Sequence, residues 1–272
     1  MMKELKRRLV ATAVVGCILF SPLTLAQDVR IGTMSQGTSG YSMGAAIARI
    51  LAEQGIRARV QPAAGTSAYL PLIATGELDF GIANAIEARE AVAGEGPFEG
   101  RKLETLRAVT IVYPFRVGVF VRDDSDIKTI ADLKGKRLAH GYTSQVTLKN
   151  VLNALIATSG LTESDIVPVM VPNVVRGADT FASGRSDAAF FAIGSGKVSE
   201  VDAAVGGLRF LPVPDDSDAI ARMKQLVPEA DVGTVQPGPE VAGVDEPLRA
   251  MMYDYVLLAG EHVPNEVVEK VV

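Results

Sequence analysis

The sequence predicts an α/β protein of two lobes, in which each lobe is a sheet flanked by helices. Strand-like and helix-like segments alternate along the chain, which is typical of a sheet covered by helices. The same alternating unit occurs twice. Two segments rich in β-branched residues lie where they can connect the two units. Together these three observations predict the fold class.

The first unit begins with an apolar strand followed by a helix of 3.6-residue periodicity. Gly55 ends this helix, and a Thr75-Gly76 turn follows the next one. A loop of glycines and small polar residues precedes each helix. The expected strands cover 29–33, 56–61 and 78–83, and the expected helices cover 42–54 and the stretch from the second loop to Ala74.

The second unit repeats this order. Its expected strands cover 137–139, 167–171 and 187–192, and its expected helices cover 146–158 and a short stretch after Pro172-Asn173. Three landmarks recur at nearly one spacing, which is 105 residues from Ser39 to Ser144 and from Gly55 to Gly160, and 108 residues from Gly76 to Gly184. We interpret this as two lobes of like topology. The general likeness of all α/β units is the alternative explanation.

Two segments are expected to connect the lobes. Residues 106–122 contain two β-branched runs on either side of Tyr113-Pro114, which predicts one strand leaving the first lobe and another entering the second. Residues 252–259 form the late strand that returns. The predicted first lobe is therefore 27–115 with 245–272, and the predicted second lobe is 116–244.

Residues 1–26 have the features of a cleaved secretory signal peptide. Four basic residues precede an apolar run at 9–20, and small residues stand before Gln27. The run is shorter than the ~20 residues that cross a bilayer, which disfavours the rival interpretation as a membrane anchor. Lipidation at Cys17 is a second alternative, because the residues before it resemble a lipobox. The predicted location is the periplasm.

Composition disfavours several classes of function. Residues 1–26 hold four basic residues, one acidic residue and the single cysteine, so removing them moves the net charge from -5 to -8. An acidic chain is a poor ligand for nucleic acid. Without cysteine or an H-E-x-x-H motif we expect no metal site, and we expect no cofactor. The aromatic content of 6% disfavours a large stacking cage for a sugar or nucleobase.

The glycine-rich loops suit a carboxylate ligand better than a phosphate. No lysine occurs between Ile31 and Arg101, so the first loop is not of Walker type, and its glycines lack the dinucleotide spacing. What remains is a helix N-terminus that attracts anions, with glycines that allow a close approach. Simple helix capping by Thr38 or Ser39 is the alternative. Ligands of open α/β sheets bind at the carboxyl ends of strands, where these loops meet across a cleft.

Other candidate residues follow from position. Asn84 ends a strand and either binds a ligand or caps the next helix. Arg116 lies among apolar residues and needs a carboxylate from the protein or the ligand. The full set of candidate ligand-binding residues is Thr38, Ser39, Gly40, Tyr41, Gly65, Thr66, Ser67, Asn84, Tyr113, Arg116, Ser144, Gln145 and Phe191.

Several blocks resemble a known family. IGTMSQGTSGYSMGAAIARIL, LIATGELDFGIAN and FASGRSDAAFFAIGSGKV are similar to the solute receptors of TRAP transporters in their TAXI class. DIKTIADLKGKRLA resembles a stretch shared among type II periplasmic binding proteins. The resemblance implies a Venus-flytrap fold and an exported, monomeric receptor. Such a receptor delivers a small organic acid or amino acid, such as 2-oxoglutarate or glutamate, to a TRAP permease.

The sequence departs from the family pattern in three places. The loop HGYTSQVTLKN replaces a Gly/Ser-rich stretch, Arg116 has no counterpart in the pattern, and the chain stops inside a helix-like segment at 269–272, which predicts a fragment. Two other functions remain open. One is a sensor subunit for a membrane kinase. The other is an enzyme acting on a small carboxylate through Asp79 or Glu87, which the two histidines disfavour because His262 is expected at the surface and His140 in the interior.

Overall fold

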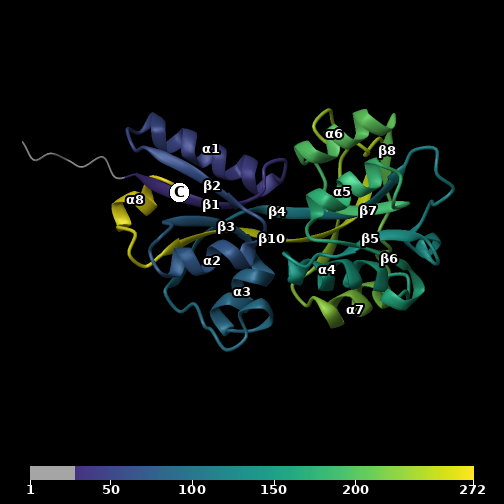
Figure 1. Cartoon of the computed structure of the whole chain (residues 1–272), viewed down its shortest axis with the longest axis horizontal. Coiled ribbons are helices and arrows are strands. Elements are labelled where there is room, and N and C mark those ends of the chain that lie inside the picture. The colour runs from purple at the N-terminus through teal and green to yellow at the C-terminus, as the bar shows by residue number, and fades with distance from the viewer. Residues whose placement is uncertain (1–27) are drawn as a thin grey trace, which may run out of the picture.

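The computed structural model describes residues 28–272 and consists of two lobes side by side (Figure 1). The first lobe contains β1 (Val29–Met34), α1 (Ser39–Glu53), β2 (Ala58–Ala63), α2 (Thr66–Ala74), β3 (Phe80–Asn84), α3 (Ala85–Ala93) and the short 3-10 helix η1 (Gly96–Phe98), with α8 (Asn265–Glu269) at its outer end. The predicted two-lobed α/β fold is confirmed.

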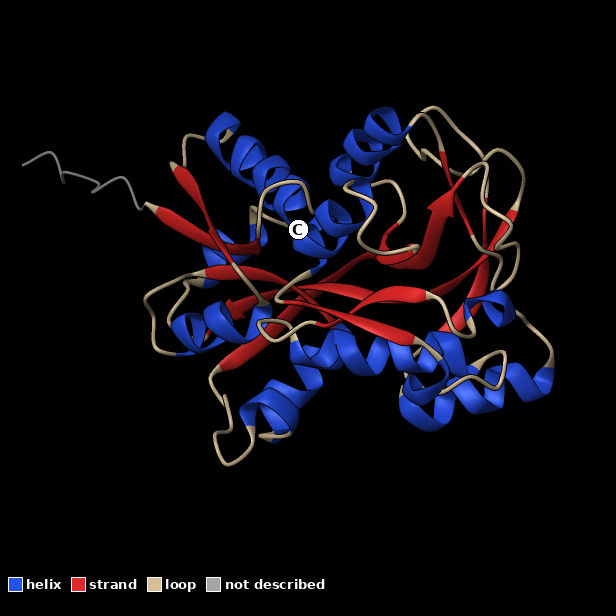
Figure 2. Ribbon diagram, turned by 45° about the vertical axis from the view of Figure 1, so that its right-hand side comes forward, coloured by secondary structure: helices blue, strands red, loops and turns tan. Residues whose placement is uncertain are grey.

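The second lobe has more elements than the first. It contains η2 (Ile130–Leu133), β5 (Arg137–Gly141), α4 (Val146–Ala157), η3 (Glu163–Asp165), β6 (Val167–Val171), α5 (Val174–Ala182), β7 (Ala188–Ala192), α6 (Gly196–Val205), β8 (Leu208–Phe210), α7 (Ser217–Leu226) and β9 (Asp231–Val235). Two long strands, β4 (Leu106–Arg122) and β10 (Leu248–Gly260), run through both lobes. Helices cover both faces of the resulting sheet (Figure 2).

Both lobes share one topology. The sheet order is β2-β1-β3-β10-β4-β7-β5-β6, so the parallel triplet β2-β1-β3 has its counterpart in β6-β5-β7. The antiparallel strands β10 and β4 lie between the triplets and join them into one ten-stranded sheet. The recurring landmarks in the sequence therefore correspond to recurring structure.

One ion pair also recurs at equivalent places. The carboxylate of Asp79 accepts hydrogen bonds from the backbone N–H of Arg30 at 2.6 Å and from its guanidinium at 3.1 Å. In the second lobe, Asp187 binds the backbone N–H of Arg137 at 2.9 Å and its guanidinium at 2.6 Å. Each aspartate precedes the third strand of its triplet, and each arginine belongs to the first strand. Each ion pair therefore fixes the register between the first and third strands of its triplet, once in each lobe.

The connection between the lobes differs from the prediction of two strands separated at Tyr113-Pro114. A single strand of 17 residues, β4, continues through this dipeptide. Proline has no N–H to donate to a neighbouring strand, so it is tolerated where the strand has no hydrogen-bonded neighbour on that side. Before Val117, β4 pairs with β10 alone, and its pairing with β7 begins only at Val117. Pro114 therefore lies on a free edge, and the exact boundary between the lobes stays a prediction.

Helix α1 begins three residues earlier than expected, at Ser39. Thr38 is its N-cap, as the capping alternative supposed. Gly44 faces β1 so closely that a Cβ atom would lie 2.4 Å from Cγ2 of Thr33. Close helix-to-sheet packing therefore explains the glycine at position 44.

The predicted signal peptide, and with it Cys17, lies outside the described residues. Within 28–272, no helix has both the length and the apolar character needed to cross a bilayer.

Candidate functional site

A cavity lies between the lobes, where the ends of β1, β3 and β7 meet the bridging strands β4 and β10. The empty space at this point is about 380 Å³, a figure that includes solvent space at the mouth of the cavity. This is the carboxyl edge of both parallel triplets, where ligands of open α/β sheets bind. The lining residues are Met34, Thr38, Ser39, Asn84, Phe115, Val117, Leu148, Val174, Phe190, Phe191, Ala192, Tyr253 and Tyr255.

The start of α1 contributes the first polar part of the wall. Thr38 Oγ1 accepts a hydrogen bond from the N–H of Tyr41 at 3.3 Å and donates to the carbonyl of Ser35 at 2.8 Å. Within the described residues, no acceptor bonds the N–H groups of Ser39 and Gly40. Free N–H groups at a helix start carry partial positive charge. This end of α1 can therefore bind an anionic group without a cationic side chain.

Asn84 contributes the second polar part, and a buried carboxylate holds it in place. Its Oδ1 accepts from the backbone N–H of Glu87 at 2.8 Å, and its Nδ2 donates to Glu87 Oε2 at 2.5 Å. Asn84 is thus the N-cap of α3, which is the capping alternative, and it also lines the cavity, so ligand binding by this residue stays a prediction. One amide N–H and one lone pair remain for a ligand.

Glu87 lies behind Asn84 and is 2% exposed. Burial raises the pKa of Glu87 to about 7, because the charged form loses its hydration. Hydrogen bonds from Thr66 and Asn84 oppose this shift, and the nearby carboxylate of Glu90 adds to it. Near neutral pH the group therefore exchanges a proton directly behind the cavity wall.

The bridging strands form an aromatic floor. The rings of Phe115 and Tyr255 stack with centroids 4.2 Å apart and an angle of 7° between planes. Tyr253 lies 5.5 Å from Phe115, and Tyr113 meets both Phe115 and Tyr255 edge-on. Although aromatic residues make up only 6% of the chain, they are concentrated at this point. Low aromatic content therefore does not exclude a stacked ligand here.

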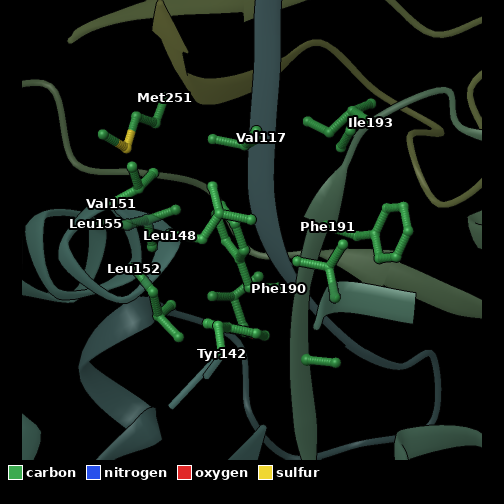
Figure 3. Close-up of a cluster of buried hydrophobic side chains, with 14 of the residues drawn as sticks. Val117, Tyr142, Leu148, Val151, Leu152, Leu155, Phe190, Phe191, Ile193 and Met251 are labelled. Carbon is green, nitrogen blue, oxygen red and sulfur yellow. The ribbon is translucent and has the colours of Figure 1, made fainter. Parts of the chain in front are cut away.

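The wall from the second lobe is apolar. Phe190, Phe191 and Ala192 come from the end of β7, Leu148 comes from α4, and Val174 from α5. Figure 3 shows Leu148, Phe190 and Val117 within a cluster of buried side chains, and this cluster extends through both lobes. The cavity therefore has polar groups on the first lobe and apolar groups on the second.

Four of the predicted site residues line the cavity, namely Thr38, Ser39, Asn84 and Phe191. Gly40 lies just behind, where a Cβ atom would be 3.0 Å from the hydroxyl of Tyr255. Thr66 is buried near Glu87, while Tyr41 lines a separate groove with Lys197. Ser67 follows Thr66 in the first turn of α2 and is not one of the residues that line the cavity.

The loop of the second lobe does not present its side chains to the cavity as predicted. Gln145 is 2% exposed, and its Oε1 accepts from the backbone N–H of Val174 at 2.9 Å. It therefore satisfies the first N–H of α5, whose N-cap residue is Asn173. Ser144 instead contacts the first lobe, because a Cβ atom on Gly65 would lie 2.0 Å from the carbonyl oxygen of Ser144.

Tyr113 and Arg116 line a neighbouring groove of about 660 Å³ with Ser42 and Glu240, and Ser39 borders both hollows. Successive residues of a strand point to opposite faces. Since Phe115 and Val117 line the cavity, Arg116 between them faces away from it. Its side chain is half-buried, and no carboxylate of the described residues lies within ion-pair distance. The groove is open enough for water to solvate it.

The lobes touch at several points around the cavity. The N–H of Lys197 donates to the carbonyl of Gly37 at 3.0 Å. Thr147 of α4 donates to Glu90 Oε2 of α3 at 2.7 Å. Arg89 forms an ion pair with Glu229 at 2.6 Å. The structure is therefore a closed arrangement, in which the two lobes enclose the cavity.

The residues considered for an enzyme have other partners. Asp79 accepts hydrogen bonds from Arg30. Burial alone would raise the pKa of Asp79, but the hydrogen bonds from Arg30 and His262 outweigh burial, so the pKa is lowered. His262 is at the surface as expected and contacts Asp79 at 3.2 Å. His140 is fully buried, and its Nε2 is 3.0 Å from Asn153 Oδ1.

No group of three or more potential metal ligands occurs in residues 28–272.

The chain resembles solved structures of low sequence identity. It is similar to the substrate-binding protein of an amino acid ABC transporter, with 13% identity, a TM-score of 0.52 and 90% of each chain covered. It is also similar to an ancestral arginine-binding protein bound to arginine, with 15% identity, a TM-score of 0.53 and 90% and 88% covered. The alkanesulfonate-binding protein of Xanthomonas axonopodis pv. citri bound to MOPS has 17% identity, a TM-score of 0.52 and 90% and 71% covered.

At these identities the likeness shows the fold, which is the two-lobed fold of type II periplasmic binding proteins. Residues 31–272 match the NMT1-like family over most of the chain, and the chain therefore belongs to that family.

Proposed function

We propose that this protein is an exported solute receptor that captures a small organic carboxylate or amino acid between its lobes and delivers it to a membrane permease. The single observation that carries the proposal is the enclosed cavity at the carboxyl ends of β1, β3 and β7. The neighbours of the same fold include an arginine-binding protein bound to arginine and an alkanesulfonate-binding protein bound to MOPS. The TAXI-like sequence blocks support a permease of the TRAP type.

The chemistry of the walls suggests how the ligand lies. Its carboxylate would bind the N–H groups of Ser39 and Gly40 and the Ser39 hydroxyl. The remainder would pack on Phe190, Phe191 and the aromatic floor. Closure of the lobes would then remove this apolar surface from water and fix the carboxylate at the helix start.

The test is a binding screen of the exported protein. Thermal shifts would be measured with organic acids, amino acids, sulfonates, sugars and nucleosides, and the hits would be titrated by calorimetry. A carboxylate or amino acid that binds with micromolar affinity or better is the expected result. Hits confined to sugars or nucleosides would contradict the proposal, as would turnover of a bound acid by the protein alone.

Two substitutions distinguish the cavity from the groove beside it. Ser39→Ala is expected to weaken carboxylate binding by about 1 to 3 kcal/mol, because a hydrogen bond to a charged group is lost. Arg116→Ala is expected to weaken binding by less than this, since Arg116 faces the groove. Calorimetry with the same carboxylate measures both. A larger loss in Arg116→Ala would place the carboxylate in the groove instead.

A further inference from the structure

Tyr253 is one of the residues that line the cavity, and its hydroxyl is buried without a hydrogen-bond partner in the described part of the chain. The residue is 3% exposed and lies on β10 opposite Phe115 of β4. Burial, together with the negative charge of Glu87, raises the pKa of Tyr253 well above its ordinary value. The hydroxyl therefore remains neutral and able to donate across the physiological pH range.

The other buried tyrosines show that this is unusual. Tyr69 donates to the carbonyl of Ile82, Tyr142 donates to the carbonyl of Ala139 at 2.9 Å, and the hydroxyl of Tyr255 is 3.7 Å from the sulfur of Met34. A buried hydroxyl without a partner destabilises a fold, and buried polar groups in proteins are usually paired. A partner supplied from within the cavity accounts for the exception.

The cavity also restricts the charge of what it encloses. None of its lining residues is an Asp, Glu, Lys, Arg or His. The carboxylate of Glu87 is behind Asn84 and is already hydrogen-bonded to it. A single anionic group can bind the start of α1, but a second charge would be buried against Phe190 and Phe191 without a partner, which is costly.

We propose that Tyr253 determines specificity by donating a hydrogen bond to the polar head of the ligand, and that this ligand is a monocarboxylate with an apolar tail. This inference rests on the proposed function and makes it more specific. It excludes dicarboxylates and cationic amino acids as preferred ligands, because their tails would bring a second charge to the apolar wall of the second lobe.

Two 2-oxo acids test the ligand class, since they share one head and differ in the tail. Calorimetry with 4-methyl-2-oxopentanoate and 2-oxoglutarate compares an apolar tail with a charged one. We expect the first to bind the wild-type protein at least tenfold more tightly. Equal affinity, or preference for 2-oxoglutarate, would overturn the inference about class. If neither these acids nor any other carboxylate binds, the proposed function fails as well.

Tyr253→Phe tests the role of the hydroxyl, and Ser195→Ala is its matched control. Ser195 is also buried with an unpartnered hydroxyl, but it does not line the cavity. Both variants are expected to melt at or above the temperature of the wild type in the absence of ligand. Only Tyr253→Phe is expected to weaken binding of 4-methyl-2-oxopentanoate, by at least tenfold. Unchanged affinity in Tyr253→Phe would overturn the role of Tyr253 while leaving the receptor function intact.

The melting temperatures give a second, independent criterion. Tyr142→Phe removes a hydroxyl that has a partner, so it should lower the melting temperature of the free protein. If Tyr253→Phe lowers the melting temperature as much as Tyr142→Phe does, the hydroxyl of Tyr253 has a partner in the free protein. That result would overturn the inference without any ligand.

Discussion

Replacing Gly65 with alanine is expected to weaken ligand binding strongly while leaving each lobe folded. The backbone of Gly65 is extended, with φ at -165°, so alanine causes no strain within the first lobe. Its added methyl group, however, would lie 2.0 Å from the carbonyl oxygen of Ser144 in the second lobe. Backbone atoms on both sides cannot yield as a flexible side chain does, so the lobes must move apart.

The expected cost follows from overpacking, which is typically 1 to 3 kcal/mol, or roughly 5- to 150-fold in affinity. Calorimetry with the best carboxylate hit measures the affinity, and small-angle scattering measures whether the protein stays extended when ligand is added. Gly196→Ala is the matched control, because no atom lies within 4 Å of a Cβ atom at that position. Ligand-induced compaction of Gly65→Ala equal to that of the wild type would contradict the closed arrangement.

The fold could be predicted because its signals are local and repeated. The strand at 167–171 was expected with the bounds that β6 has, and the late strand at 252–259 lies within β10. Gly55 and Gly160 follow their helices in both lobes. These features depend on hydrophobic periodicity and on helix ends, which a single sequence displays directly.

The site was only partly predictable, because topology repeats more faithfully than side-chain direction. Ser39 and Ser144 occupy equivalent loops, yet only Ser39 lines the cavity. The difference arises after Ser144, where the side chain of Gln145 turns inward and accepts from the first N–H of α5. The spacing of landmarks contains no information on which way such a side chain points.

Strand alternation, by contrast, was an available signal. In the run YPFRV, Phe115 and Val117 share one face and Arg116 lies on the other. The same rule places Tyr253 and Tyr255 together, with Asp254 facing away. Reading both bridging strands in this way would have predicted the aromatic floor and would have separated Arg116 from it. Composition alone could not, because an average of 6% aromatic residues says nothing about where they gather.

Replacing Glu87 with glutamine is expected to change the pH dependence of stability more than any other single carboxylate substitution near the cavity. Folding raises the pKa of Glu87 to about 7 from the value near 4.5 of an unperturbed glutamate. The folded protein therefore holds this proton more tightly than the unfolded chain. The resulting stabilisation is complete below about pH 4.5 and is lost as the pH rises through about 7.

The size of the effect follows from the shift in pKa. The pKa rises from 4.5 to about 7, so at about 1.4 kcal/mol per unit the effect amounts to at most roughly 3 to 4 kcal/mol. Glu87→Gln is neutral at every pH and keeps an oxygen that can accept the hydrogen bond from Asn84 Nδ2. Its free energy of unfolding should therefore match the wild type near pH 4.5 and exceed it by up to roughly 3 to 4 kcal/mol at pH 8.

Urea titrations of both proteins between pH 4.5 and 8 measure this difference. Burial also raises the pKa of Glu90, so the free energy of unfolding falls with rising pH in the wild type and in Glu87→Gln alike. Only the difference between these two proteins therefore reports on Glu87. Glu53→Gln, the same substitution at an exposed carboxylate on α1, is the matched control. A gap between Glu87→Gln and the wild type that stays constant from pH 4.5 to 8 would mean that Glu87 does not titrate in this range. In that case a fixed charge, and not an exchanging proton, would hold Asn84 against the cavity.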